Sequence, residues 1–287
     1  MKYPVIAGVK RHTLFSPNHI GNDAAIFSAV AFLLDKAGYQ VKQYTEQEFL
    51  SAEIQERAIF TMLRNEQAVR KLQEFEKNGG VAINSGFGIE NCTREKMTRI
   101  LMENKIPHPD SAIVGITDEV SSFTSGKNIE SCWVKRGDFH AIHREDVTYV
   151  RNKENLREVM AEYALRGIGK VVINEHLEGD LLKFYGVSGT SFFHYFYPFE
   201  KKHSKFGYET INGKPSGIPF SVDELKDICE NASRVLQVMV YGGDCIISPD
   251  GSIRIIDFND WPSFAPCREA ASEVIASAIV NKIRELE

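Results

Sequence analysis

The first 90 residues alternate short apolar runs with longer amphipathic segments. Residues 5–9 form a continuous β-prone run, a polar loop follows, and an apolar helical segment then ends near Gly38, with Asn22 or Asp23 as its expected N-cap. A strand, loop, helix and strand in this order predict a parallel α/β unit, whose ligands bind at the loops after the strands. The loop 12–22 is therefore a candidate substrate lip, although loops are polar in any case. Further strands are expected over 40–44, 58–62 and 81–84, a helix over 66–78 and a connector at 86–88.

The rest of the chain mixes β-prone runs with amphipathic helices in a less regular order. Residues 201–217 carry turn signals and basic residues without a clear period, which predicts a loop. Strands are expected over 112–116, 132–135, 147–150, 171–173, 181–187 and 192–199, and helices over 93–104, 155–166, 222–238 and 270–286.

Composition narrows the class of protein. The 287 residues are enough for two or three packed units, and a net charge of −5 argues against nucleic acid as the main partner. The five cysteines are scattered without a Cys-x-x-Cys pair, which favours a reducing compartment and gives no zinc site or disulfide framework. The apolar run at the N-terminus is too short for a signal peptide, and the run 24–34 is too short to cross a bilayer. We therefore expect a cytoplasmic protein that does not enter a membrane.

A pair of β-rich runs near the carboxyl end carries the strongest chemical signal. If Asp250-Gly251 forms a two-residue turn, Asp244 lies directly opposite Asp257, where two bare carboxylates would repel. Asn259 shares a face with Asp257, because side chains alternate along a strand. These oxygens together suit a hard cation such as Mg²⁺. The alternatives are that the side chains are solvated, as is usual beside turns, or that a bulge shifts the pairing by one residue.

Asp257-Phe258-Asn259 resembles the Asp/Glu-x-Asn strand end that holds magnesium in the ATP-grasp superfamily, and Asp244 matches the earlier acidic ligand. The resemblance covers nearly the whole chain. It implies an ATP-grasp fold, α+β in its catalytic part, that follows a small parallel α/β domain. The implied domains are residues 1–90, a lid over 91–175, and a metal and nucleotide subdomain over 176–287.

The same resemblance implies a set of nucleotide-binding residues. Lys96 and Lys135 match phosphate-binding lysines of the superfamily, although a solvated surface lysine is the commoner case. The stretch 171–187 is similar to the hinge that reads the adenine edge and the ribose, but it is equally compatible with an ordinary β-hairpin that turns at Gly179. The implied hinge residues are Asn174, Glu175, His176 and Leu177.

The segment after Lys135 departs from the superfamily pattern. Many of these ligases have a glycine-rich loop there, whereas this chain has Arg136-Gly137-Asp138-Phe139-His140. Arg136 or His140 is expected to supply charge and hydrogen bonds in place of backbone amides, although His140 is equally compatible with a surface position. Lys183 resembles a lysine of the inositol-polyphosphate kinases that share this fold.

The resemblance implies an ATP-dependent ligase that uses Mg²⁺, or Mn²⁺ in its place, and joins a small carboxylate to an amine or a thiol through an acyl phosphate. A kinase acting on a polyol or inositol-phosphate-like molecule is the first alternative. A non-catalytic ATP-binding module is the second, and the retained Asp244, Asp257 and Asn259 argue against it. Such proteins are often dimers, so a homodimer is also expected.

Overall fold

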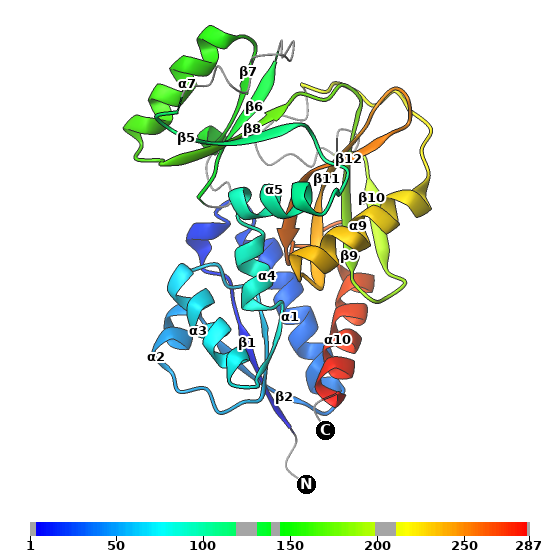
Figure 1. Ribbon diagram of the computed structural model, residues 1–287. Helices are drawn as coiled ribbons and strands as arrows, with labels where there is room; N and C mark the ends of the chain where they lie inside the picture. The colour runs from blue at the N-terminus through cyan, green and yellow to red at the C-terminus, as the bar shows by residue number, and fades with distance from the viewer. Residues whose placement is uncertain (1–3, 119–130, 139–143, 199–210, 286–287) are drawn as a thin grey trace.

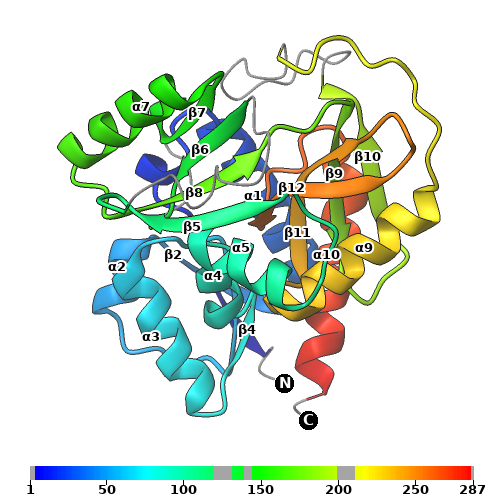
Figure 2. The ribbon, with the colours of Figure 1, turned by 45° about the horizontal axis from the view of Figure 1, so that its top comes forward.

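The structure is a computed structural model that describes residues 4–118, 131–138, 144–198 and 211–285. Within these ranges the strands form three four-stranded sheets. Figures 1 and 2 show that the sheets occupy separate regions, with the parallel sheet at the base and the two antiparallel sheets side by side above it. The mixed α/β architecture predicted from the sequence is confirmed.

The parallel sheet has the order β2-β1-β3-β4. Alternate side chains of β1 enter two different cores, because the sheet is covered on both faces. Ile6 packs with α1 and α10 on one face, whereas Ala7 and Val9 pack with α2 and α3 on the other. The elements are β1 (Val5–Val9), α1 (Ile20–Lys36), β2 (Gln40–Tyr44), α2 (Glu46–Ser51), β3 (Ala58–Thr61), α3 (Glu66–Lys77), β4 (Val81–Ile83) and α10 (Arg268–Arg284).

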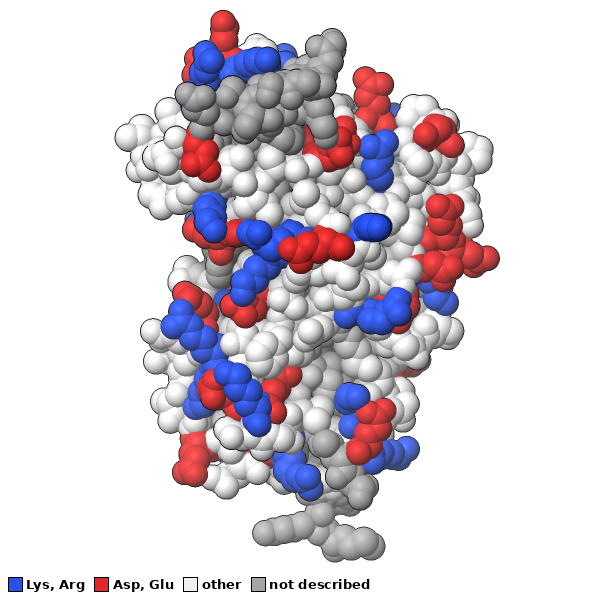
Figure 3. Space-filling model, viewed as in Figure 1, with Lys and Arg blue, Asp and Glu red and all other residues white. Residues whose placement is uncertain are grey.

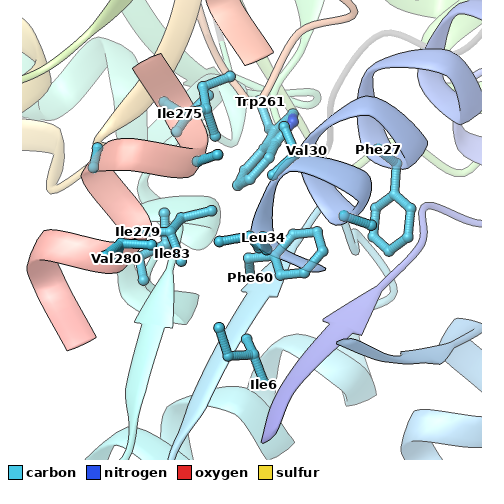
Figure 4. Packing of buried hydrophobic residues seen from close by; sticks show 14 of the residues in the cluster. Ile6, Phe27, Val30, Leu34, Phe60, Ile83, Trp261, Ile275, Ile279 and Val280 are labelled. Carbon is cyan, nitrogen blue, oxygen red and sulfur yellow. The ribbon is translucent and has the colours of Figure 1, made fainter. Parts of the chain in front are cut away.

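The larger core joins the two ends of the chain. Figure 4 shows Val30 and Leu34 of α1 facing Ile275 and Ile279 of α10, with Phe60 of β3 beneath them. The closing helix of the chain thus packs on the first α/β unit, so the C-terminal segment contributes to the N-terminal core. The domain limits at 90 and 175 stay a prediction.

Two local expectations in this unit were wrong. Helix α1 begins at Ile20, with His19 as N-cap, so Asn22 and Asp23 lie inside its first turn; the carboxylate of Asp23 accepts a hydrogen bond from Arg11 instead of capping. The expected connector at 86–88 is the start of a short helix, α4 (Gly86–Asn91). A Cβ on Gly88 would lie 2.1 Å from the backbone oxygen of Gln237. Glycine at this position therefore allows α4 to pack closely against the backbone of Gln237.

The second sheet is antiparallel, with the order β5-β8-β6-β7, and α7 covers one of its faces. The third is also antiparallel, with the order β10-β9-β11-β12, and α5 and α9 cover one face. The second sheet and its helix are β5 (Ser111–Gly115), β6 (Cys132–Arg136), β7 (Val147–Val150), α7 (Lys153–Leu165) and β8 (Lys170–Glu175). The third sheet and its helices are α5 (Arg94–Glu103), β9 (Asp180–Val187), β10 (Phe193–Phe196), α9 (Val222–Leu236), β11 (Val240–Ile247) and β12 (Ile253–Asp260).

Strands β8 and β9 belong to different sheets, so residues 176–179 cross from one sheet to the other. This excludes the ordinary β-hairpin that the sequence left open. The backbone of this crossing joins the two antiparallel sheets.

Charged side chains of both signs lie on the surface of the molecule (Figure 3). On the face shown in Figure 3, acidic and basic side chains are interspersed. Among the helices that the structure describes, none is long and apolar enough to span a bilayer.

Candidate active site

A cavity of about 300 Å³ lies between the two antiparallel sheets and reaches the carboxyl ends of the parallel strands. The residues expected at the metal, the hinge and two of the three lysine positions border it. These are Lys135, Asn174, Glu175, His176, Leu177, Lys183, Asp244, Asp257 and Asn259.

The β11–β12 hairpin brings Asp244 directly opposite Asp257, as expected, but by a different route. The turn is not the two-residue type, because Ile247 pairs with Ile253 and residues 248–252 form the loop. A β-bulge next to Asp244 then leaves Ile256 without a partner and restores the expected pairing. The longer loop shifts the strand pairing by one residue, and the bulge shifts it back.

Strand alternation separates the cavity face of this sheet from its core face. Asp257 and Asn259 border the cavity, whereas Phe258 between them is fully buried against Phe184 and Tyr241. The hairpin also needs a glycine beside Asp244, because a Cβ on Gly243 would lie 2.2 Å from the backbone oxygen of Asp257. Asp244 and Asp257 are thus paired across the two strands and border the same cavity.

Each carboxylate holds a cationic side chain. Lys183 lies opposite Asp244 on β9, and its Nζ donates to Asp244 Oδ1 at 2.7 Å. Arg94 reaches Asp257 from α5 and donates from Nη1 to Oδ1 at 2.7 Å and from Nη2 to Oδ2 at 3.4 Å. Burial raises the pKa of Asp257, but the charges of Arg94 and Lys135 outweigh it and hold the pKa well below its ordinary value.

Arg94 takes the position in the cavity that the sequence assigned to Lys96. Lys96 does not border the cavity; it pairs with Glu90 at 2.7 Å, and 47% of its side chain is exposed. Residues two apart on a helix point about 200° apart, so the two side chains leave opposite faces of α5. The helix itself was predicted correctly, with Thr93 as its N-cap, but a different residue of its first turn enters the cavity.

Lys135 comes from β6 of the neighbouring sheet and enters the cavity next to the bulge. Its Nζ donates to the backbone oxygen of Ile256, the residue that the bulge leaves unpaired, at 3.0 Å. The side chain is 7% exposed. Burial and the nearby charge of Arg94 lower the pKa of Lys135 from 10.5 to about 7.

A backbone hydrogen bond joins the segment that carries Arg94 to the segment that carries Lys135. The amide of Glu95, the residue after Arg94, donates to the oxygen of Gly137 at 2.9 Å, and Gly137 in turn donates to Lys170 O at 2.9 Å. A Cβ on Gly137 would lie 2.9 Å from that Lys170 oxygen, which explains the glycine after Arg136. Helix α5 and strand β6 are thus fixed to each other where their cations enter the cavity.

The other end of the cavity has an aromatic wall beside the hinge. Trp133 and Tyr149 have ring centroids 5.0 Å apart, and Trp133 Nε1 donates to His176 Nδ1 at 3.1 Å. Burial lowers the pKa of His176, which favours the neutral ring that accepts this bond. Glu175 accepts from Arg254 Nη1 at 3.0 Å, so its carboxylate joins the hinge to β12. Trp133 was not expected from the sequence, because a strand tryptophan is usually a core residue.

Two further sequence expectations have different outcomes. Arg136 does not border the cavity; it donates from Nε to Asp138 at 2.8 Å and from Nη1 to Asp146 at 3.4 Å. Its guanidinium therefore fixes the end of β6 and does not face the cavity. His140 lies outside the described residues. Of the loop expected over 201–217, the described part is held by Asp180, which accepts from the amides of Ser216, Gly217 and Ile218 at 2.6, 2.8 and 2.9 Å.

The end of the cavity at the parallel sheet is lined by buried ion pairs. Arg11 follows β1 and pairs with Asp23 at 3.1 Å, and Arg64 follows β3 and pairs with Asp260 at 3.1 Å. Ligands of parallel sheets bind beyond the carboxyl ends of the strands, which is where these groups lie. The loop that the sequence nominated as a lip contributes Ser16, His19 and Asn22 to the lining.

One buried carboxylate supports both loops at this end. Glu46 is 2% exposed and accepts from the amides of His12, Arg64 and Asn65 at 2.9, 3.1 and 2.9 Å. Because these amides follow β1 and β3, Glu46 fixes the two segments that carry Arg11 and Arg64.

We expect Glu46→Ala to lower the free energy of unfolding by about 3 kcal/mol, because it leaves buried amides without an acceptor. Urea unfolding followed by circular dichroism measures the change. Glu53→Ala, at an exposed position on the same stretch of chain, is the matched control and should change stability little. A loss no greater than that of the control would show that the amides find other acceptors.

The oxygen set of the hairpin fits Mg²⁺. Asp244, Asp257 and Asn259 border the cavity, and Mg²⁺ prefers the hard carboxylate and amide oxygens that such side chains carry. In the described part of the chain, no group of three or more His, Cys, Asp or Glu side chains is placed to hold a metal. Mg²⁺ takes about six oxygen ligands, so the remaining ones would come from phosphate and water.

No protein-family model matches the chain, and no curated protein matches its sequence. Among solved structures it is similar to D-alanyl-alanine synthetase A from Vibrio cholerae, with a TM-score of 0.70, 11% identity and 98% of each chain covered. The D-alanine–D-alanine ligase of Bacillus anthracis complexed with ATP gives 0.70, 12% and 100% of each chain. The ATP-grasp ligase PsnB complexed with a minimal precursor gives 0.63 and 16%, with 97% of this chain and 99% of PsnB covered.

Identities this low show a shared fold and leave the reaction to be argued from the site. The similarity extends over nearly the full length of each structure, so it includes the parallel domain and both antiparallel sheets. The chain has the fold of the ATP-grasp ligases, as its sequence predicted.

Proposed function

We propose that this protein is an ATP- and Mg²⁺-dependent ligase that joins a small carboxylate to an amine. The observation that carries the proposal is the convergence of three cations, Arg94, Lys135 and Lys183, on the carboxylates Asp244 and Asp257 inside one cavity. The cations come from three different elements, α5, β6 and β9. A backbone hydrogen bond between Glu95 and Gly137 fixes α5, which carries Arg94, to the end of β6, which carries Lys135. Such an arrangement suits a triphosphate, whose transfer depends mainly on positioning and charge neutralisation.

The reaction has two steps. First, a carboxylate oxygen of the acid substrate attacks the γ-phosphorus of ATP, the bond to the β,γ-bridging oxygen breaks, and ADP leaves. The amine nitrogen then attacks the carbonyl carbon of the acyl phosphate. Inorganic phosphate leaves with the electron pair of the C–O bond, and the nitrogen loses a proton to water. A thiol in place of the amine would give a thioester by the same route.

In this reaction the cationic side chains bind and orient phosphate oxygens. Asp244, Asp257 and Asn259 would hold Mg²⁺, which supplies charge neutralisation and fixes the γ-phosphate. Lys135 and Arg94, both nearly buried, would contact phosphate oxygens in a site from which water is largely excluded, where each charge has its greatest effect. The acid substrate would lie towards Arg11 and Arg64.

The adenine would lie at the aromatic wall. Trp133 and His176 border the cavity beside the hinge, where a base can stack and where backbone groups of the crossing segment are available. Asn174 and Leu177 border the same end. Hinge binding of adenine and phosphate binding at Lys135 are consistent with one extended nucleotide, since Lys135 and Trp133 project from the same strand.

Phosphate release tests the reaction class. The protein is incubated with ATP, Mg²⁺ and either pooled small carboxylic acids and amines, including amino acids, or pooled polyols, and ADP and free phosphate are both measured in each case. A ligase produces them in equal amounts, and mass spectrometry should then show a new amide. ADP without free phosphate, together with a phosphorylated polyol, would support the kinase instead. Nucleotide binding without turnover of any acceptor would contradict both.

Tryptophan fluorescence tests the adenine position. Of the two tryptophans, Trp133 borders the cavity and Trp261 is fully buried in the core. We expect Mg²⁺ and a non-hydrolysable ATP analogue to change the emission of the protein and of Trp261→Phe, but not that of Trp133→Phe. A response that disappears only in Trp261→Phe would place the base elsewhere.

A further inference from the structure

Both carboxylates at the hairpin are occupied by cations of the protein itself. Arg94 contacts both oxygens of Asp257, and Lys183 contacts Asp244 Oδ1. The exposed fractions of the side chains are 6% for Arg94 and 24% for Asp257, and 20% and 23% for Lys183 and Asp244. These are therefore ion pairs inside the cavity, in the place where a divalent cation would have its ligands.

Resting on the proposed function, we infer that Arg94 and Lys183 stand in for the metal. Each holds one of the two carboxylates in an ion pair until a triphosphate draws the cation onto its oxygens, so that the divalent cation and the nucleotide bind as a coupled pair. Arg94 and Lys183 are on this account positioning residues for the metal as well as ligands of the phosphates.

The charges at the site favour this coupling. Two carboxylates lie next to Arg94, Lys135 and Lys183, and all five groups border the same cavity. A divalent cation that enters alone must displace two close ion pairs and leave their cations in a poorly solvated space. A triphosphate brings about four negative charges, which give the displaced cations new partners and make binding of the metal more favourable. By linkage, each ligand must strengthen binding of the other by the same factor.

The ligand count points the same way. The hairpin offers two carboxylates and one amide oxygen, and Mg²⁺ needs about six oxygens in a regular octahedron. A triphosphate supplies further oxygens at the same moment as it removes the competing cations. The simplest rival account is that the two ion pairs are ordinary structural pairs and that the metal binds without regard to them.

Mn²⁺ binding measured by electron paramagnetic resonance separates the two accounts without any measurement of turnover. Mn²⁺ is titrated into the protein alone and into the protein saturated with a non-hydrolysable ATP analogue. We expect Mn²⁺ alone to bind at least roughly tenfold more weakly to the site than Mn²⁺ in the presence of the analogue. A titration without protein measures the Mn²⁺ that the analogue binds in solution, and this amount is subtracted.

Variants test which residues cause the weakness. Arg94→Met and Lys183→Met each remove one of the two ion pairs, so each should bind Mn²⁺ alone roughly tenfold more tightly than the unchanged protein. Arg94→Lys keeps the charge and should stay weak. Arg99→Met, on the same helix but with 51% of its side chain exposed, is the matched control and should not change Mn²⁺ binding. Thermal melting of each variant shows that it is folded, and Lys183→Met decides the result if Arg94→Met is not.

The outcomes are distinct. If the unchanged protein binds Mn²⁺ alone as tightly as with the analogue, or if neither methionine variant tightens it, the stand-in role is wrong while the proposed ligase stands. If the analogue with Mn²⁺ does not bind to the unchanged protein at all, the proposed function itself fails.

Discussion

Replacing Asp257 by Asn should lower turnover roughly thousandfold while the protein still folds. Asp257 accepts hydrogen bonds from Arg94, and the neighbouring cations lower the pKa of Asp257 so that its carboxylate stays charged to low pH. Asparagine has nearly the same shape and can still accept a bond from Arg94, but it cannot offset the charge of a divalent metal. The change therefore removes ligand charge and preserves the packing.

The measurement is ADP formation under saturating ATP with the acceptor found by the phosphate-release screen, together with thermal melting. Asp250→Asn is the matched control, because Asp250 lies in the exposed loop of the same hairpin and accepts from Ser252 instead of facing the cavity. The control should keep normal turnover. Asp257→Asn with more than about a tenth of normal activity would remove this carboxylate from the metal site.

Lys135→Met should separate activity from stability. We expect kcat/KM for ATP to fall roughly hundredfold, because a buried cation aimed at the phosphates is lost. Stability should rise, because the folded protein disfavours the charged lysine: burial and Arg94 lower the pKa of Lys135 from 10.5 to about 7. Methionine fills similar volume without a charge, so the folded state loses a desolvation cost on the order of a few kcal/mol.

The pH dependence follows from the direction of this shift. Below the folded pKa of about 7, Lys135 is charged in both states and its full cost is present. Above it, the folded protein loses the proton while the unfolded chain keeps it up to about 10.5, so the stability of the unchanged protein rises with pH.

The stability advantage of Lys135→Met should therefore be greatest at pH 6 and much smaller at pH 9. Urea unfolding of both proteins at the two pH values measures it. Lys170→Met is the matched control, since Lys170 has 55% of its side chain exposed. An advantage that is equal at both pH values would show that the folded protein does not lower the pKa of Lys135, and a destabilised variant would show that the ammonium is favoured in the folded protein.

The parts of the site that were predictable are those with a local sequence pattern. Asp244, Asp257 and Asn259 lie on two adjacent strands, so alternation and pairing alone place them on one face. Their register was correct although the turn was not, since the longer loop and the bulge shift the pairing in opposite directions. The parallel strands were predicted for a similar reason, because each is a short apolar run between loops.

The missed parts depend on contacts that have no period in the sequence. Arg94 was missed because the rotation of α5 is set by its contact with β6, through Glu95 and Gly137, and not by its own residues. Trp133 was missed because no pattern in the sequence distinguishes a strand tryptophan that lines a cavity from one that packs in a core. Glu46, which fixes both loops of the parallel sheet, resembles any acidic residue at the start of a helix until the fold brings the amides of Arg64 and Asn65 to it.

The central claim is that the cavity between the two antiparallel sheets holds a metal-bound triphosphate. A crystal grown with Mn²⁺ and a non-hydrolysable ATP analogue tests it by anomalous scattering. We predict an anomalous peak in contact with the side-chain oxygens of Asp244, Asp257 and Asn259, with the phosphates on Lys135 and the base beside Trp133. An analogue bound elsewhere, or a peak away from all three oxygens, would contradict the account.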